Sequence, residues 1–165
     1  ENGEESVMMP EFRFAERKDC ALILQFIADL AEYEKMADQV VATPAMLEEE
    51  IFERKKAEVL FVLEDGKEVG FALFFHNFST FLGRAGLYLE DLFVKPEFRG
   101  KGYGKATLKK LAQIAVERNC GRFEWWCLDW NRPSIDFYLS LGAEPMSEWT
   151  TYRVTGDALR KLAEE

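Results

Sequence analysis

The feature that most constrains the fold is a glycine-rich turn between a predicted strand and a predicted helix. Gly100, Gly102 and Gly104 occupy alternate positions after a strand over residues 87–94 and open a helix over residues 104–119. Glycine allows positive φ and removes side chains that would block a ligand. The exposed amides and the positive end of the helix dipole then favour an anion, and phosphate is the expected ligand.

The turn also sets the topology around it. The helix over residues 104–119 leads into a nearly continuous hydrophobic run over residues 123–128, which is typical of a strand covered on both faces. A strand, a crossover helix and a second strand imply a parallel pair. Upstream, strands over 59–63 and 69–78 flank the hairpin signal Asp65-Gly66 and predict an antiparallel meander. The expected fold class is α/β (α+β), a mixed sheet with helices on its faces.

The remaining elements follow one another with short connections. We expect a strand over 12–14, a helix capped by Asp19, a helix starting at Thr43-Pro44, a helix from Pro133 to near Gly142, a last strand over 149–154 and a terminal helix over 157–163. Residues 1–10 are expected to be a flexible tail without the build of a signal peptide, and residues 11–165 a single domain.

Composition excludes several classes of protein. The 165 residues are 48% hydrophobic and 31% charged, which is a normal globular balance. The net charge of −9 disfavours nucleic acid and anionic membrane as partners and favours a small cation, although acidity also serves solubility alone. The odd number of cysteines, Cys20, Cys120 and Cys127, lacks metal-binding spacing and predicts a reducing, cytoplasmic location. No apolar run approaches the ~20 residues of a membrane span.

Two phosphate-binding patterns do not fit the turn. The nucleotide P-loop needs Gly at Arg99 and Ser or Thr at Ala106, and the dinucleotide fingerprint needs Gly at Lys105. Arg99, Lys101 and Lys105 nevertheless surround the turn with positive charge. A flexible surface turn without a ligand is the remaining alternative.

Three blocks carry a resemblance to a known family. They are the turn Arg99-Gly100-Lys101-Gly102-Tyr103-Gly104, the strand Leu87–Val94, and Asn131–Tyr138 followed by Leu141-Gly142-Ala143. In order and spacing they resemble the GNAT superfamily of N-acetyltransferases, over residues 11–155. The resemblance implies a GNAT fold, in which a mixed central sheet has a splayed parallel pair and helices flank both faces. It also implies acetyl-CoA as co-substrate, without a metal.

A narrower group within this superfamily is similar to the chain. Leu30–Met36 followed by Gln39-Val40, and Tyr88–Asp91, resemble the diamine (spermidine/spermine-type) acetyltransferases, a group that includes thialysine acetyltransferases. The loop over residues 79–86 lacks the usual tryptophan of that group, which leaves the exact amine open.

The resemblance assigns the cofactor residues. The pantetheine arm would hydrogen-bond to the backbone of Phe93 and Val94, and the pyrophosphate would meet the amides from Gly100 to Lys105. The full expected set is Phe93, Val94, Arg99, Gly100, Lys101, Gly102, Tyr103, Gly104, Lys105, Asn131 and Ser134.

One helix face is expected to carry Asn131, Ser134 and Tyr138, which are spaced i, i+3, i+7. By resemblance, the Tyr138 hydroxyl lies near the CoA sulfur and donates a proton to the departing thiolate. From spacing alone, Asn131 serves equally well as a helix cap, and a core aromatic is the favoured role for Tyr138; the resemblance reverses the second preference.

The acceptor amine reaches an enzyme mostly protonated, so a base is needed. Glu90 is the expected base, through water, while Asp91 alternates to the opposite face unless a β-bulge redirects it. Tyr33 and Glu34 are candidates for binding a cationic tail, although an exposed helix end explains them equally well. His76 is expected to be structural.

The sequence therefore predicts direct transfer of acetyl from acetyl-CoA to a primary amine of a small polycationic molecule, because no cysteine aligns with a nucleophile role. The alternatives are a peptide or protein amine as acceptor, or a non-catalytic CoA-binding regulatory domain. By resemblance, the protein is expected to be a homodimer in which the strand around Trp149–Tyr152 takes part.

Overall fold

The computed structural model describes residues 9–164, which divide into two compact units, one ending at Trp126 and the other beginning at Cys127. The first unit holds the whole sheet, and the second holds two helices and the segment between them. The tail expected over residues 1–10 lies outside the described residues except for Met9 and Pro10.

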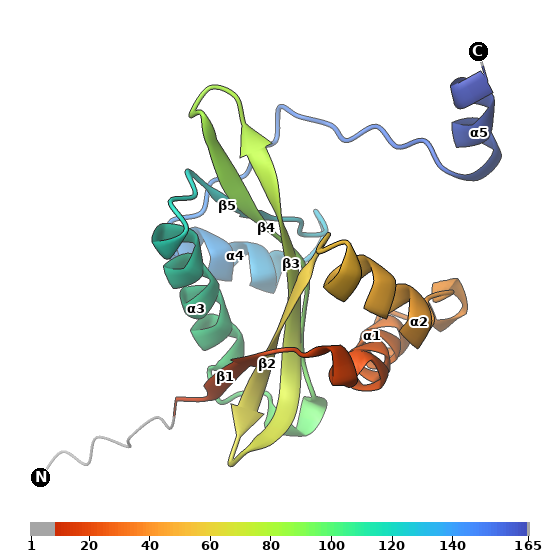
Figure 1. The fold of residues 1–165 in the computed structure, drawn as a ribbon. Coiled ribbons are helices and arrows are strands. Elements are labelled where there is room, and N and C mark those ends of the chain that lie inside the picture. The colour runs from red at the N-terminus through yellow and green to blue at the C-terminus, as the bar shows by residue number, and fades with distance from the viewer. Residues whose placement is uncertain (1–8, 165) are drawn as a thin grey trace, which may run out of the picture. The chain divides into compact units, whose positions relative to one another are not determined.

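The first unit is built on a five-stranded sheet with the strand order β1-β2-β3-β4-β5. The strands are β1 (Glu11–Phe14), β2 (Glu58–Glu64), β3 (Lys67–Ser79), β4 (Arg84–Val94) and β5 (Phe123–Trp125). The first three pairings are antiparallel, and β4 and β5 are parallel (Figure 1). The expected mixed sheet and parallel pair are thereby confirmed.

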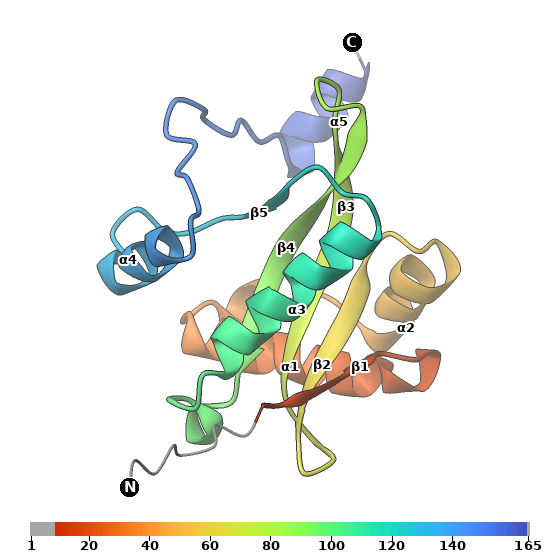
Figure 2. The same cartoon turned by 90° about the vertical axis from the view of Figure 1, so that its left-hand side faces the viewer.

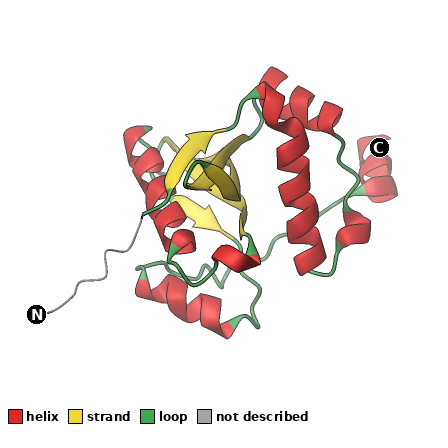
Figure 3. Cartoon of the chain, turned by 90° about the horizontal axis from the view of Figure 1, so that it is seen from below, coloured by secondary structure: helices red, strands yellow, loops and turns green. Residues whose placement is uncertain are grey.

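Helices cover both faces of this sheet. On one face lie α1 (Cys20–Tyr33) and α2 (Pro44–Leu47), which continues as a π-helical segment over Glu48–Glu53. On the other lies α3 (Tyr103–Glu117), which crosses the strands in front of the sheet in Figure 2. Figure 3 shows the strands enclosed between these helices. Short 3-10 turns occupy Arg17–Asp19, Ala37–Gln39 and Pro96–Phe98. The flanked sheet agrees with the expected GNAT fold.

The core under α1 is aromatic. The Phe26 ring stacks on Phe71 with centroids 5.3 Å apart, and Phe61 packs beside them. This cluster of buried residues consists of Ile23, Phe26, Ile51, Val59, Phe61, Leu63, Phe71 and Phe93. Burial of one such side chain contributes roughly 1.5–3 kcal/mol, so the cluster holds α1 firmly against the sheet.

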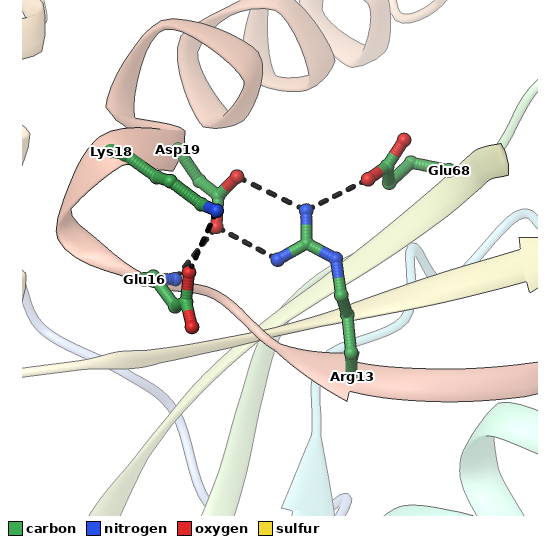
Figure 4. A network of polar contacts seen from close by, with 5 residues as sticks. All are labelled: Arg13, Glu16, Lys18, Asp19 and Glu68. Atoms are coloured by element: carbon green, nitrogen blue, oxygen red, sulfur yellow. Dashed lines mark hydrogen bonds and ion pairs between the residues drawn. The ribbon is translucent and has the colours of Figure 1, made fainter. Parts of the chain in front are cut away.

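A charged network joins the first strand to the start of α1 (Figure 4). Arg13 donates to both carboxylate oxygens of Asp19, at 2.8 and 3.0 Å, and to Glu68 on β3 at 2.7 Å. Asp19 also accepts from the Glu16 amide at 2.7 Å. These hydrogen bonds satisfy the buried Asp19 carboxylate and lower its pKa and that of Glu68. The network thereby fixes β1 and the start of α1 to β3, which is distant from both along the chain.

The second unit contains α4 (Arg132–Ser140) and α5 (Gly156–Glu164). The strand expected over 149–154 is absent from the described residues, and Trp149 and Tyr152 are exposed instead. The strand expected over 123–128 is shorter, because β5 ends at Trp125. A strand needs a neighbour for its hydrogen bonds, and aromatic and β-branched composition alone does not supply one. No helix among residues 9–164 is long and apolar enough to span a membrane.

Candidate active site

The glycine-rich turn adopts the conformation that its composition predicts. Gly100 and Gly102 both have φ of +80°, and Gly102 is the residue that precedes the first turn of α3. L-residues with a side chain rarely take this conformation, so these two positions require glycine.

Gly104 has a different reason to be glycine. Its φ is not positive, and a Cβ placed there would meet no atom within 4 Å. Glycine inside a helix costs ~0.5–1 kcal/mol relative to alanine, so neither the backbone nor packing explains it. The space above Gly104 lies at the first turn of α3, where helix amides have no intrahelical acceptor. The position fits a phosphate group approaching the backbone closely.

The turn is held in place by a residue of the sheet that the sequence did not single out. The Glu64 carboxylate accepts hydrogen bonds from Lys101 Nζ at 2.7 Å and from the Tyr103 hydroxyl at 2.6 Å. Tyr103 is buried against Val62 and Val69, so its ring anchors the start of α3. The charge of Lys101 is therefore already paired, and Lys105 extends from the same turn with an exposed side chain.

The parallel pair beside the turn separates along its length. Pairing of β4 with β5 runs from Leu87 to Leu89 and stops there, while β4 continues to Val94. Beyond Leu89, β5 therefore supplies no backbone partner for β4, because β5 ends at Trp125.

A β-bulge lies where the pairing stops. Leu89 pairs with Phe74 and Asp91 with Leu73, so Glu90 is an extra residue on β4. Leu73 packs against the cluster under α1, which places Asp91 on the α1 side of the sheet. The bulge considered for this strand is therefore present, and it prevents the regular alternation that would place Glu90 and Asp91 on opposite faces.

The carboxylates around the bulge influence one another. Burial raises the pKa of Asp91 to about 6, and the negative charges of Glu90 and Glu34 add to the shift. Glu34 follows the last residue of α1, so the end of this helix and the middle of β4 contribute to one acidic group. We call Glu34, Glu90 and Asp91 the acidic cluster. A group of this charge favours a cationic ligand.

An aromatic and a guanidinium group lie beside the acidic cluster. The Tyr33 ring at the end of α1 packs near Phe93, with centroids 6.4 Å apart. The Arg99 guanidinium carbon lies 4.3 Å from the Tyr33 centroid and 5.3 Å from that of Phe93. Arg99 Nε also donates to the Val94 carbonyl at 2.9 Å. The first residue of the glycine turn thus reaches the end of α1.

The second unit carries the other expected site residues. Asn131 Oδ1 accepts from the Ser134 amide at 3.3 Å and caps α4, which is the structural role considered for it. Tyr138 is half-buried, and burial, followed by the charge of Cys127, raises the pKa of its hydroxyl. The phenol is protonated at neutral pH, as a proton donor must be, because even an unshifted tyrosine has a pKa of about 10.

The structure therefore brings Tyr33, Glu34, Glu90, Asp91 and Phe93 together in the first unit. His76 lies elsewhere, with its ring 3.5 Å from Arg118. No group of three or more side chains suited to a metal is found among residues 9–164, and the described cysteines are free.

A mixed sheet with a parallel pair, followed by a glycine turn at the N-terminus of a helix, defines an α/β protein whose turn is suited to a phosphate-bearing ligand. Comparison with known proteins narrows this class. The model of the acetyltransferase (GNAT) family matches residues 24–143.

Individual relatives match along nearly the whole chain. Thialysine N-epsilon-acetyltransferase of Sus scrofa is 39% identical, covering 92% of this chain and 95% of its own. Spermidine/spermine N(1)-acetyltransferase-like protein 1 of Homo sapiens is 33% identical over 94% of this chain but only 24% of its own length. Among solved structures, an integron cassette protein from V. cholerae has a TM-score of 0.80 and 31% identity, covering 96% of this chain and 99% of its own.

The chain belongs to the acetyltransferase (GNAT) family and is an N-acetyltransferase. The family uses acetyl-CoA. The pyrophosphate of this molecule fits the glycine turn, where Gly100 and Gly102 have positive φ and the space above Gly104 is open.

Proposed function

We propose that the protein transfers acetyl from acetyl-CoA to a primary amine of a small cationic diamine- or polyamine-like molecule. The acidic cluster beside the exposed Tyr33 ring is the observation that carries this proposal. Carboxylates neutralise ammonium groups, and a tyrosine face attracts them. The similarity to thialysine N-epsilon-acetyltransferase and to a spermidine/spermine N(1)-acetyltransferase-like protein supports the same substrate class.

The donor side of the site is formed by the glycine turn and the last part of β4. We propose that the amides from Gly100 to Lys105 bind the pyrophosphate and that the backbone of Phe93 and Val94 binds the pantetheine arm. Asn131 and Ser134 at the start of α4 complete the set. Acetyl-CoA supplies an activated thioester, whose carbonyl carbon bonds to the amine nitrogen as the C–S bond breaks.

The amine must lose a proton before it attacks, because alkyl amines have a pKa near 10. Sequence reasoning favours Glu90 as the base. Burial raises the pKa of Asp91 to about 6, which is close to the operating pH and suits a general base. We propose that Asp91 takes the proton, directly or through water, and that Glu90 raises its basicity and binds the incoming cation. At the other end of the reaction, Tyr138 donates its phenolic proton to the departing thiolate.

The central test is an assay of CoA thiol release with spermidine, putrescine, thialysine and lysine. We expect turnover with at least one of these amines. If Asp91 is the base, kcat/KM of the wild type should fall as the pH drops below about 6. This decrease should be absent in Asp91→Asn and present in Glu90→Gln. An acceptor found only among peptides or proteins would contradict the proposal, as would acetyl-CoA binding without turnover.

We further propose that both units act as one catalytic domain over residues 11–165, in a cytoplasmic homodimer. The free cysteines support a reducing compartment. Exposed apolar side chains in the second unit, among them Trp149, Tyr152 and Leu162, support a partner for this segment. Light scattering should give a mass twice the 19.1 kDa of the chain, and a mass of one chain at micromolar concentration would contradict the dimer.

A further inference from the structure

Arg99 belongs by sequence to the anion-binding turn, but its side chain extends to the acceptor end of the site. The guanidinium lies over Tyr33, with 4.3 Å from its carbon to the ring centroid, and beside Phe93. Its Nε is fixed on the Val94 carbonyl at 2.9 Å. The Arg99 guanidinium therefore occupies the Tyr33 ring. Under the proposed function, the same ring contacts the ammonium group of the acceptor amine.

Both substrates are thus expected to act on the contact between Arg99 and Tyr33. An acceptor ammonium needs the Tyr33 ring and is repelled by a guanidinium already on it. A pyrophosphate in the adjoining turn attracts the same guanidinium, because charge-assisted hydrogen bonds to phosphate are stronger than a contact with an exposed ring. Tyr33 is 63% exposed, so the ring has room for another cation once Arg99 leaves it.

We propose that Arg99 couples the two substrates: it rests on Tyr33 in the free protein and moves to the pyrophosphate when the donor binds, which opens Tyr33 to the amine. The inference rests on the proposed function, since it assumes that the turn binds CoA and that Tyr33 borders the amine site. Arg99 acts here as a positioning residue. It touches no reacting atom, but it makes the affinity for each substrate depend on whether the other is bound.

Thermodynamic linkage relates the affinity for CoA to the affinity for the amine. If CoA removes a competing cation from Tyr33, CoA raises amine affinity, and the amine raises CoA affinity by the same factor. Couplings of this kind are typically about 5- to 150-fold, and we expect a value at the lower end because the contact is exposed. The neutralisation of the Arg99 charge by pyrophosphate acts in the same direction.

Isothermal titration calorimetry of the full chain with spermidine, without and with saturating CoA, measures the coupling directly. CoA carries no acetyl group, so no reaction interferes. For the wild-type protein we expect spermidine to bind at least about fivefold more tightly when CoA is present. In Arg99→Gln, spermidine should bind the free protein more tightly than it binds the wild type, CoA should bind less tightly, and the coupling factor should fall towards one.

Two further variants separate coupling from simple loss of a charge or of folding. Lys105→Gln removes a positive charge from the same turn without touching Tyr33, so CoA affinity should fall while the coupling factor stays at the wild-type value. Tyr33→Leu removes the shared ring and should abolish the coupling although Arg99 is intact. Thermal melting of each variant confirms that it is folded.

The inference is overturned if wild-type spermidine affinity is the same with and without CoA, or if Arg99→Gln keeps the wild-type coupling factor. Either result can occur in an enzyme that still acetylates spermidine, so it leaves the proposed function intact. Absence of acetyl transfer to every amine in the thiol-release assay contradicts the proposed function instead.

Discussion

At the scale of single residues, two neighbouring carboxylates illustrate what local sequence does and does not determine. The Glu90-Asp91 pair was recognisable as a candidate acidic site, but alternation along a strand would separate the two side chains. The extra residue in β4 prevents this separation, and the burial of Asp91 raises its pKa to about 6. The bulge and the burial of Asp91 both depend on the register between β3 and β4. The sequence of β4 alone does not determine this register.

The raised pKa of Asp91 predicts an unusual dependence of stability on pH. Because the folded protein holds this proton more tightly than the unfolded chain does, Asp91 stabilises the fold below about pH 4 and loses this contribution as the pH rises through about 6. At neutral pH the ionised carboxylate is a cost. We expect Asp91→Asn to raise the free energy of unfolding by ~1–2 kcal/mol near pH 7.5, measured by urea denaturation.

The gain from Asp91→Asn should shrink as the pH falls through about 6 and disappear well below pH 4, where the wild-type carboxyl is protonated in both the folded and the unfolded state. Glu90→Gln serves as the matched control, because Glu90 is exposed and should give a smaller change. A lower stability of Asp91→Asn at pH 7.5 would contradict the burial of this charge.

Tyr138 supports a prediction about the chemical step. Replacing it with phenylalanine removes the proposed proton donor while retaining the ring. We expect kcat to fall by about 10²-fold, since a general acid typically contributes between 10² and 10⁴. The Kd for CoA, measured by calorimetry, should stay within about twofold of the wild type. A kcat within about twofold would show that the thiolate leaves without this donor.

At the scale of elements, the glycine turn and α3 form the part of the site that was most predictable. Alternating glycines between a strand and a helix have few structural uses, and Gly100 and Gly102 take the expected positive φ. The contact of Lys101 with Glu64 was not predictable, because the two residues are 37 positions apart. Nor was the path of Arg99 to Tyr33. Long-range side-chain partners follow from the completed fold.

Gly104 predicts a conflict between stability and ligand binding. Because a Cβ there meets open space, Gly104→Ala should raise the free energy of unfolding by ~0.5–1 kcal/mol. The added methyl group would occupy the space assigned to pyrophosphate, so the KM for acetyl-CoA should rise several-fold. Lys109→Ala, an exposed change farther along α3, should leave this KM unchanged. A more stable Gly104→Ala with wild-type KM would remove this position from the donor site.

The network around Arg13 makes the stability of the fold depend on pH in the opposite direction from Asp91. Its hydrogen bonds lower the pKa of Asp19 and Glu68, so their contribution is present above about pH 4 and is lost as the pH falls. Arg13→Met should lower the free energy of unfolding by ~2 kcal/mol at neutral pH, because it leaves the buried Asp19 carboxylate with fewer donors.

This penalty should shrink in acid, where Asp19 is protonated and needs its partner less. Arg17→Met is the matched control, since its ion pairs with Glu48 and Glu53 are exposed and contribute little. Equal losses in the two variants, or a loss for Arg13→Met that does not depend on pH, would contradict the role given to the buried carboxylate.

At the scale of the whole molecule, hydrophobic patterning predicted the helices of both units, including α4 and α5, but it also predicted a last strand that does not form. The strands and helices up to Trp126 have apolar faces that identify them. The hairpin and the crossover helix predicted the antiparallel meander and the parallel pair, whereas the pairing of β1 with β2 was not predicted. The last expected strand, over residues 149–154, does not form in the described chain. Its aromatic residues favour a strand, but a strand needs a neighbouring strand for its backbone hydrogen bonds. Composition does not identify that neighbour.

The central claim is that acetyl passes from acetyl-CoA to a small cationic amine, and mass spectrometry of the product tests it most directly. Spermidine, putrescine and thialysine would each be incubated with acetyl-CoA and the protein. The account predicts an amine carrying one acetyl group, formed by the wild type and about 10²-fold more slowly by Tyr138→Phe. Unmodified amines, with acetyl found only on peptide acceptors or not transferred at all, would contradict it.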